Sequence, residues 1–421
     1  MGSYLNPGNF SFRGSLRSKI YVDKSKLIAK TNEVLCTEQK YICVSRPRRF
    51  GKSMAANMLA AYYDRSENTE DLFQNLAISG EKSYEENLNQ YDVIKINMQE
   101  FLSMAGTIEK MLEMLKDYLV VDFEEAFPEV RFRDKNNLIQ TMKDVFSYTK
   151  CPFVILIDEW DCLFREYKQD KEAQKKYLDF LRAWLKDKDY IAMAYMTGIL
   201  PIKKYGSHSA LNMFTEYSMT DPGELAEYFG FTEPEVSAIC EKYGMSFEEA
   251  KTWYDGYQLV AHRQWKDECY SMYNPKSVVE AMLRHKFGTY WNQTETYEAL
   301  KIYIQMDMDG LKASVIRMLT GDSVPINTGT FSNDMTTFAT KDDVLTLLVH
   351  LGYLTYNSID GTVSIPNKEV SQEYINAIST MNWHGVADSV EASRKLLEAL
   401  WQMDADAVAA GIEKAHEEIS I

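Results

Sequence analysis

Residues 40–53 constrain the fold more than any other part of the chain. A short apolar run at residues 41–44 is typical of a buried strand, and a loop leads from it to Gly51-Lys52-Ser53, where a helical pattern begins and runs to about Tyr63. Strand, loop, Gly-Lys-Ser and helix in this order are the layout of a phosphate-binding P-loop. Backbone N–H groups at a positive helix N-terminus surround a phosphate in such a loop. Lys52 would add a positive charge on the β- and γ-phosphates, and the Ser53 hydroxyl would ligate Mg²⁺.

The match to the P-loop pattern is incomplete, because Arg46 stands where the pattern has a glycine. Arg48 and Arg49 add two more charges to a loop that normally carries small residues. A strand-to-helix turn with a basic surface is therefore the alternative interpretation. On the P-loop interpretation, Arg48 and Arg49 are also candidates for an arginine finger. The residues expected to contact nucleotide here are Arg48, Arg49, Phe50, Gly51, Lys52, Ser53 and Met54.

A second motif supports the P-loop interpretation. Residues 153–157 are consecutively apolar and are followed by Asp158-Glu159. Such a run suits a central strand of a parallel sheet, and carboxylates at its end lie where open α/β sheets bind their ligands. This is the Walker B pattern, in which Asp158 holds Mg²⁺ and Glu159 polarises the attacking water. An acidic turn after a buried strand is the alternative, but the two motifs occur in the right order with room for one strand between them.

A third polar residue ends another predicted strand. Residues 191–196 form a buried strand that ends at Thr197-Gly198. In P-loop ATPases with an additional strand, a polar residue in this position senses the γ-phosphate, and Thr197 would do so here. A Thr-Gly turn is the alternative. Lys203 and Lys204 follow in a loop, where a solvated pair is the expected outcome.

Composition restricts the class of protein. The 421 residues are enough for two to four domains, and 45% hydrophobic with 26% charged residues is typical of a globular protein. The net charge of −16 gives no support to nucleic-acid binding, although a local basic face would permit it. The six cysteines form no CxxC pair, and no apolar stretch reaches about 18 residues. We therefore expect a reduced cytoplasmic protein that does not span a membrane and has no zinc site.

The pattern of elements predicts four parts. Residues 1–221 alternate strands and helices and are expected to form an AAA-like α/β P-loop ATPase domain with a parallel sheet flanked by helices. Residues 222–330 read as a helical domain, in which we interpret the aromatic-rich stretch 253–257 as packing. Residues 331–385 resemble a winged helix, with a helix at 341–351 and two strands around Asp360-Gly361. Residues 386–421 are expected to form C-terminal helices.

The winged-helix interpretation does not by itself imply DNA binding. A helix that reads DNA needs Lys and Arg, and residues 341–351 offer only Lys341 and His350. Contact with protein or regulation within the chain is therefore favoured.

Together these motifs resemble the bacterial AAA-ATPase-like family. The resemblance rests on residues 21–24, on Ser45 to Ser53 with its Arg-Pro-Arg-Arg-Phe-Gly-Lys form, on residues 157–161 and on later motifs at 197–202, 209–212, 253–257 and 273–275. By this resemblance Arg46 is a family trait, and Lys52, Ser53, Asp158 and Glu159 carry ATP and Mg²⁺. Such proteins often continue into a PD-(D/E)xK nuclease-like domain, and no strand pair of that kind is seen in the last hundred residues, so no nuclease activity is expected of this chain.

The leading functional hypothesis is an ATPase in which Mg-dependent hydrolysis of ATP moves the C-terminal regulatory parts. Glu159 and Lys52 would be the catalytic residues, and Ser53 with Asp158 the metal ligands. One alternative is the ATPase module of a nuclease-associated nucleic-acid system. Another is a non-hydrolysing nucleotide switch that recruits a protein partner, and self-association is left open in each case.

Overall fold

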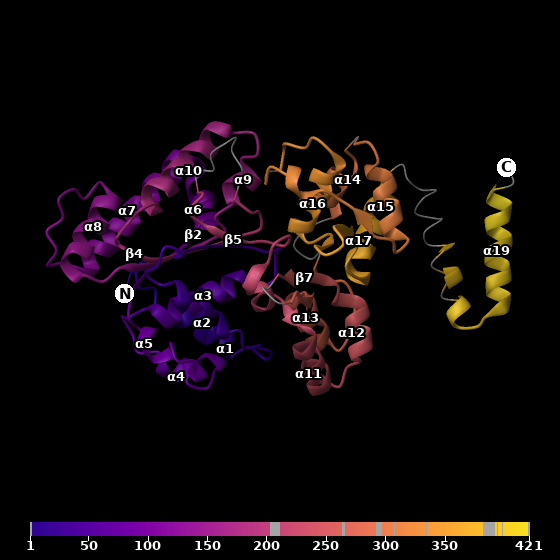
Figure 1. The fold of residues 1–421 in the computed structure, drawn as a ribbon, viewed down its shortest axis with the longest axis horizontal. Helices are drawn as coiled ribbons and strands as arrows, with labels where there is room; N and C mark the ends of the chain where they lie inside the picture. Colours follow the sequence, from indigo (N-terminus) through magenta and orange to yellow (C-terminus); the bar gives the residue numbers. More distant parts are fainter. Residues whose placement is uncertain are drawn as a thin grey trace.

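The computed structural model describes residues 2–202, 211–262, 266–291, 297–306, 308–333, 335–381, 392–393, 395–397 and 399–419. In Figure 1 the N-terminal half forms one body on the left and residues from about 222 form a second on the right. The last helix, α19 (Ala405–Ile419), lies apart from both and belongs to the predicted C-terminal helices.

A parallel sheet organises the N-terminal body. Within the described residues it has five strands, in the order β2-β3-β4-β1-β5, and every neighbouring pair is parallel. The strands are β1 (Tyr41–Ser45), β2 (Asp92–Asn97), β3 (Phe153–Asp158), β4 (Ile191–Gly198) and β5 (Thr215–Tyr217). The apolar runs of β1, β3 and β4 are buried along their whole length, because helices cover both faces of the sheet. The predicted α/β P-loop fold is confirmed, and β4 is the additional strand between β1 and β3.

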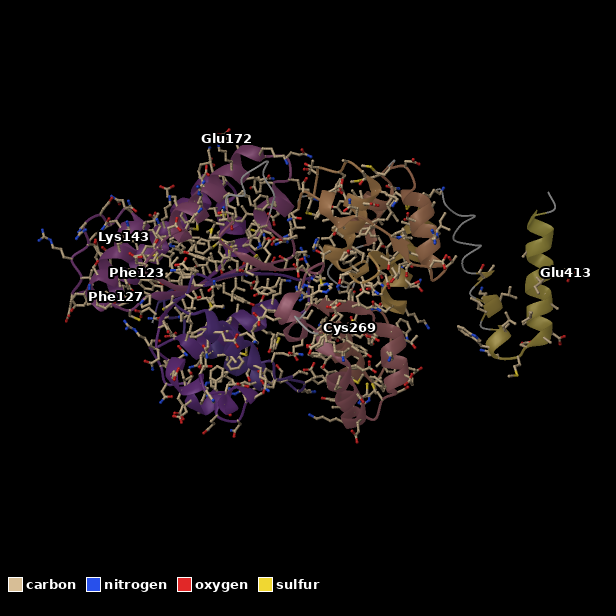
Figure 2. The ribbon with its side chains drawn as sticks, in the orientation of Figure 1. Phe123, Phe127, Lys143, Glu172, Cys269 and Glu413 are labelled. Atoms are coloured by element: carbon tan, nitrogen blue, oxygen red, sulfur yellow. The ribbon has the colours of Figure 1, made fainter. Side chains whose placement is uncertain are left out.

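The helices of this body form two layers, one on each face of the sheet (Figure 1). On one face α3 (Lys52–Tyr63) shares a hydrophobic cluster with α1 (Phe10–Leu16) and α2 (Lys26–Val34). On the other face lie α6 (Met98–Ala105), α7 (Ile108–Ala126), α8 (Leu138–Thr149) and α10 (Lys171–Leu185). Phe123 of α7, labelled in Figure 2, packs edge-on against Phe153 of β3 with ring centroids 5.5 Å apart. The shorter helices are α4 (Glu70–Phe73), η1 (Ala77–Gly80), α5 (Tyr84–Asn87) and α9 (Cys162–Glu166).

The middle region contains a small sheet that the sequence reading did not predict. Its helices are η2 (Gly223–Tyr228), α11 (Glu233–Tyr243), α12 (Phe247–Tyr254) and α13 (Pro275–Arg284), as expected of a helical part. In the described chain, β6 (Phe231–Thr232), β8 (Glu268–Tyr273) and β7 (Tyr257–Ala261) add an antiparallel sheet in that order. The helical interpretation was therefore incomplete, because β7 lacks a clean alternation of apolar and polar residues and only Gln258 is exposed in it.

The C-terminal region has the predicted winged-helix layout. After α14 (Tyr297–Ile304) and α15 (Leu311–Leu319) come β9 (Val324–Pro325), η4 (Thr328–Thr330), α16 (Lys341–Leu351), β10 (Thr355–Asn357), β11 (Thr362–Ser364) and α17 (Lys368–Ser379). The described part of this sheet has the order β10-β11-β9 and is antiparallel. Helix α16 begins at a capping box formed by Thr340 and Asp343 and ends at Gly352.

Helix α16 faces inward. Its residues from Asp343 to Leu351 are all buried. Its apolar side chains belong to the same hydrophobic cluster as α6, α7, α8 and α10 on one face of the parallel sheet. In winged helices that bind DNA, the corresponding helix enters a groove. Because α16 is buried, it serves packing in this protein.

Candidate nucleotide site

The loop between β1 and α3 folds around the side chain of Lys52. Gly51 lies just before α3 with φ of 90°, a conformation that glycine adopts at little cost. The Lys52 Nζ donates hydrogen bonds to the carbonyl oxygens of Arg46 and Pro47, each at 2.9 Å. Burial lowers the pKa of Lys52, and the nearby carboxylates of Glu159 and Asp158 oppose that shift. The amine is thus buried and directed into the curve of the loop, where a phosphate would compete for it.

The three arginines of the loop have different surroundings. Arg46 is fully buried and its Nη1 donates to the carbonyl oxygens of Ser45 and Tyr217, at 2.9 and 2.8 Å. Burial lowers the pKa of Arg46 to about 10. Because Tyr217 belongs to β5, Arg46 braces the carboxyl ends of β1 and β5. Arg48 lines a cavity beside the loop, whereas Arg49 is exposed and has φ of 71°.

The other predicted contact residues of the loop divide between exposed and buried positions. Ser53 is exposed in the first turn of α3, and Met54 beside it is 45% exposed. Phe50 is buried and its ring packs edge-on against Tyr257 of β7, with centroids 5.1 Å apart. The Phe50 carbonyl also accepts a hydrogen bond from the backbone N–H of Gly230 at 3.1 Å. Phe50 therefore joins the loop to the middle region, and its ring is committed to that contact.

The acidic pair lies at the carboxyl end of β3, next to the end of β4. Asp158 is buried and accepts hydrogen bonds from the Thr197 hydroxyl and, at 3.1 Å, from the backbone N–H of Glu159. The sheet places Thr197 opposite Val44 of β1 and Met196 opposite Ile157 of β3, so three strand ends meet at this point. Asp158, Glu159 and Thr197 near these strand ends, and Lys52 at the start of α3, thus lie along the carboxyl edge of the sheet.

Glu159 occupies a strained position in this edge. Its φ of 53° lies in the left-handed region, which costs a non-glycine residue about 1–3 kcal/mol. Its carboxylate accepts a hydrogen bond from Arg165 of α9. Burial raises the pKa of Glu159, while Arg165 and Lys52 act to lower it. Strain at a residue that points into a cavity is typical of a functional position.

Asp161 has a structural role at this site. Its Oδ2 accepts hydrogen bonds from the backbone N–H groups of Ile199 and Leu200, at 3.0 and 2.8 Å. It therefore holds the turn that follows β4. Gly198 is required in this turn, because a Cβ there would lie 2.8 Å from the Trp160 ring and from Asp161.

A cavity of about 470 Å³ opens beside the acidic pair. It is lined by Arg48, Asn97, Gln99, Glu159, Arg165 and Glu166. Asn97, Gln99, Arg165 and Glu166 were not among the predicted site residues. Asn97 ends β2 level with Asp158, so its position at a strand end was a signal that the sequence already carried. Arg165 gave no such signal, because its contact depends on how the chain turns after β3.

The N-terminal segment 21–24 connects two parts of the chain. The Lys24 Nζ contacts the Glu235 carboxylate and donates to the carbonyl oxygen of Glu227, both at 2.7 Å. Burial lowers the pKa of Lys24 against the effect of Glu235. Lys24 therefore ties the N-terminal body to α11, and its amine is already satisfied there. Lys203 and Lys204 lie outside the described residues.

The C-terminal region closes over the loop. A Cβ at Gly352, the residue that follows α16, would lie 2.8 Å from the Cβ of Pro47, so the Pro47 ring packs closely against the Gly352 backbone. The Tyr257 hydroxyl donates a hydrogen bond to the Gly352 carbonyl at 2.9 Å. Pro47 and Phe50 of the loop are thus in contact with the end of α16 and with β7.

These features define the class of protein. A parallel sheet with an additional strand, a Gly-Lys-Ser loop between its strand and helix, and carboxylates on a neighbouring strand end are the architecture of a P-loop NTPase. Residues 12–207 match the family model AAA-ATPase_like, described as "Predicted AAA-ATPase". This stretch is similar to the AAA-ATPase-like family, and the resemblance drawn from the motifs is confirmed.

A curated relative and two solved structures are similar to the chain. The relative, described as "Uncharacterized protein in vnfD 5'region" of Azotobacter chroococcum mcd 1, is 24% identical over 287 residues, which are 66% of this chain. The match spans 51% of that relative's length. The Aeropyrum pernix ORC1 protein in complex with DNA aligns over 91% of this chain and 99% of its own, with 11% identity and a TM-score of 0.29. The Aeropyrum pernix ORC2 protein (ADPNP-ADP complexes) aligns over 90% and 97%, with 7% identity and a TM-score of 0.34. Similarities this weak assign neither ligand nor partner.

In the part of the chain that the structure describes, no helix combines the length and apolar character needed to cross a bilayer.

Proposed function

We propose that the chain binds ATP with Mg²⁺ at the loop of residues 46–53 and hydrolyses it. The proposal rests on one observation: the buried amine of Lys52 lies near Asp158 and Glu159, and Asp158 is bonded to Thr197. An amine for phosphate, a hydroxyl and a carboxylate for a hard cation, and a second carboxylate for water form a donor set that suits ATP·Mg²⁺.

Each residue would have one role. Lys52 would neutralise phosphate charge, and Ser53 with Asp158 would hold the cation. Glu159 would accept a proton from the attacking water. Thr197 would keep the Asp158 carboxylate in place and report on the terminal phosphate. Magnesium, when bound, neutralises charge on the phosphoryl group that is transferred.

Nucleotide occupancy would be communicated to the C-terminal region through the loop. Pro47 and Phe50 are part of the segment that must surround the phosphates, and they contact Gly352 and Tyr257. A change in the loop on binding or release would therefore move the packing of α16 and β7, which is a physical route from chemistry to domain movement.

The test is phosphate release and nucleotide affinity for wild type, Lys52→Ala and Glu159→Gln. We expect Lys52→Ala to lose ATP affinity. Glu159→Gln should keep affinity and lose turnover by about 10²- to 10⁴-fold. Matched controls are Lys143→Ala on α8 and Glu172→Gln on α10, both on the surface and labelled in Figure 2. Wild type that neither binds nor hydrolyses ATP would refute the proposal.

The alternative functions give different results in the same measurements. Tight binding without turnover in wild type would favour the non-hydrolysing switch. DNA affinity with a steep salt dependence would favour the nucleic-acid module. The burial of α16 from Asp343 to Leu351 makes the second outcome less favourable, because that helix would first have to leave the core.

A further inference from the structure

Arg165 forms a bridge between two carboxylates beside the proposed catalytic centre. It donates from Nη2 to Oε2 of Glu159, and its Nε lies 3.3 Å from Oδ2 of Asp161. The side chain of Arg165 is only 10% exposed, and those of Glu159 and Asp161 are 23% and 0% exposed. An ion pair removed from water to this degree is weakly screened and fixed in its geometry.

The far end of this bridge is anchored. Asp161 accepts two backbone hydrogen bonds from the turn after β4, so its carboxylate cannot follow Arg165 if the latter moves. Arg165 lies on α9, one helical turn after Asp161, which immediately precedes the first residue of that helix. The turn after β4 therefore fixes the position of the guanidinium through Asp161. The guanidinium fixes the orientation of the Glu159 carboxylate.

The backbone of Glu159 makes such support necessary. A residue at φ of 53° gains no help from a regular strand or helix in choosing its side-chain orientation. The contact with Arg165 occupies Oε2, while Glu159 also lines the cavity next to the loop. One carboxylate oxygen is thus held and the other is left to accept a proton from water.

We propose that Arg165 is a positioning residue that orients the Glu159 carboxylate toward the cavity for general-base catalysis. This inference rests on the proposed ATP hydrolysis. Several charged groups face Glu159: Arg165 from α9, Lys52 from α3, Asp158 and Asp161 from the strand end and turn, and Arg48 and Glu166 across the cavity. Removing Arg165 takes away the contact that holds Oε2 of Glu159.

The consequence is a loss of turnover that spares nucleotide binding. Without Arg165 the Glu159 carboxylate has no fixed orientation toward the cavity, so the attacking water is positioned less well. The groups proposed to hold phosphate and the cation keep their contacts, so ATP affinity should change little.

The experiment compares wild type, Arg165→Gln and Arg165→Lys, with Arg182→Gln on the exposed side of α10 as control. kcat, KM, ATP affinity and melting temperature are measured for each. We expect Arg165→Gln to lower kcat by about 10²-fold and to change ATP affinity by less than about threefold. A kcat equal to that of wild type, or a loss confined to KM, would overturn the inference.

Two further measurements keep the outcomes separable. If Arg165→Gln does not fold, Arg165→Lys decides: its amine cannot hold two carboxylates as a guanidinium fork does, so a lower kcat with unchanged ATP affinity supports the inference and an unchanged kcat overturns it. If wild type shows no turnover, the proposed function fails by itself. Crystal structures of wild type and Arg165→Gln are then compared. A Glu159 carboxylate that has left the cavity in the variant supports the positioning role, and one that stays in place refutes it.

Discussion

Gly256→Ala is the substitution for which the structure gives the clearest expectation. Gly256 lies between α12 and β7 with φ of 105°, and a Cβ there would be 2.0 Å from the Pro366 carbonyl oxygen and 2.8 Å from its carbonyl carbon. The next residue, Asn367, donates a hydrogen bond from Nδ2 to the Asp255 carbonyl at 2.9 Å. Alanine would therefore push the start of α17 away from the end of α12 and weaken this bond.

Two terms contribute to the loss of stability. The positive φ costs alanine about 1–3 kcal/mol. The overlap with a backbone carbonyl, which cannot rotate away as a side chain can, adds about 1–3 kcal/mol typical of overpacking. The free energy of unfolding should therefore fall by about 2–6 kcal/mol in total.

The matched control is Gly244→Ala at the end of α11. Gly244 has φ of 63°, and a Cβ there meets nothing within 4 Å, so only the backbone term applies, about 1–2 kcal/mol. Urea unfolding followed by tryptophan fluorescence measures both variants, with m-values compared because a chain of several regions need not unfold in two states. Equal losses in the two variants would refute the reasoning that Gly256 is required by its contact with Pro366.

Three other substitutions test separate parts of the structure. Thr197→Val keeps the shape of the side chain but removes the hydrogen bond to Asp158, so turnover should fall about 10-fold with ATP affinity nearly unchanged; a loss of affinity alone would contradict this role. Asp161→Ala removes one of the two carboxylates that Arg165 contacts and leaves two backbone N–H groups without their acceptor. The free energy of unfolding in urea should fall by about 3–5 kcal/mol, whereas a fall below about 1 kcal/mol would show that the turn after β4 does not depend on Asp161. Glu369 accepts hydrogen bonds from the backbone N–H groups of Tyr290 and Trp291, and burial raises its pKa. Between the unfolded-state pKa of about 4.3 and the raised folded-state pKa, the folded state therefore binds more protons than the unfolded state. Stability should fall as pH rises through this window, and Glu369→Gln should flatten that fall in unfolding measured at several pH values; an unchanged slope would exclude Glu369 as its source.

The strand-end residues of the site were accessible from the sequence. Apolar runs followed by polar residues predict parallel strands whose carboxyl ends meet, and this places Lys52, Asp158, Glu159 and Thr197 together without knowledge of any side-chain rotamer. The winged-helix layout followed from the same kind of pattern, since a helix and two short strands around Asp360-Gly361 are local features.

What the sequence could not supply depends on contacts between distant segments. The ring of Phe50 packs on Tyr257, which a reading of the loop alone cannot anticipate. Arg165 reaches Glu159 only because the chain enters a left-handed turn after β3. The burial of α16 was not evident either, because its apolar residues would equally suit a helix covered on one side. Strands β7 and β8 were missed because both are short and irregular in pattern.

The left-handed backbone at Glu159 sets two kinds of selection against each other. Glycine or asparagine would occupy φ of 53° with less strain than glutamate does. A laboratory population of variants screened only for resistance to heat should therefore accumulate glycine or asparagine at this position, and a population screened for turnover should retain glutamate. The composition found at position 159 after each screen would show which of the two demands has maintained glutamate there.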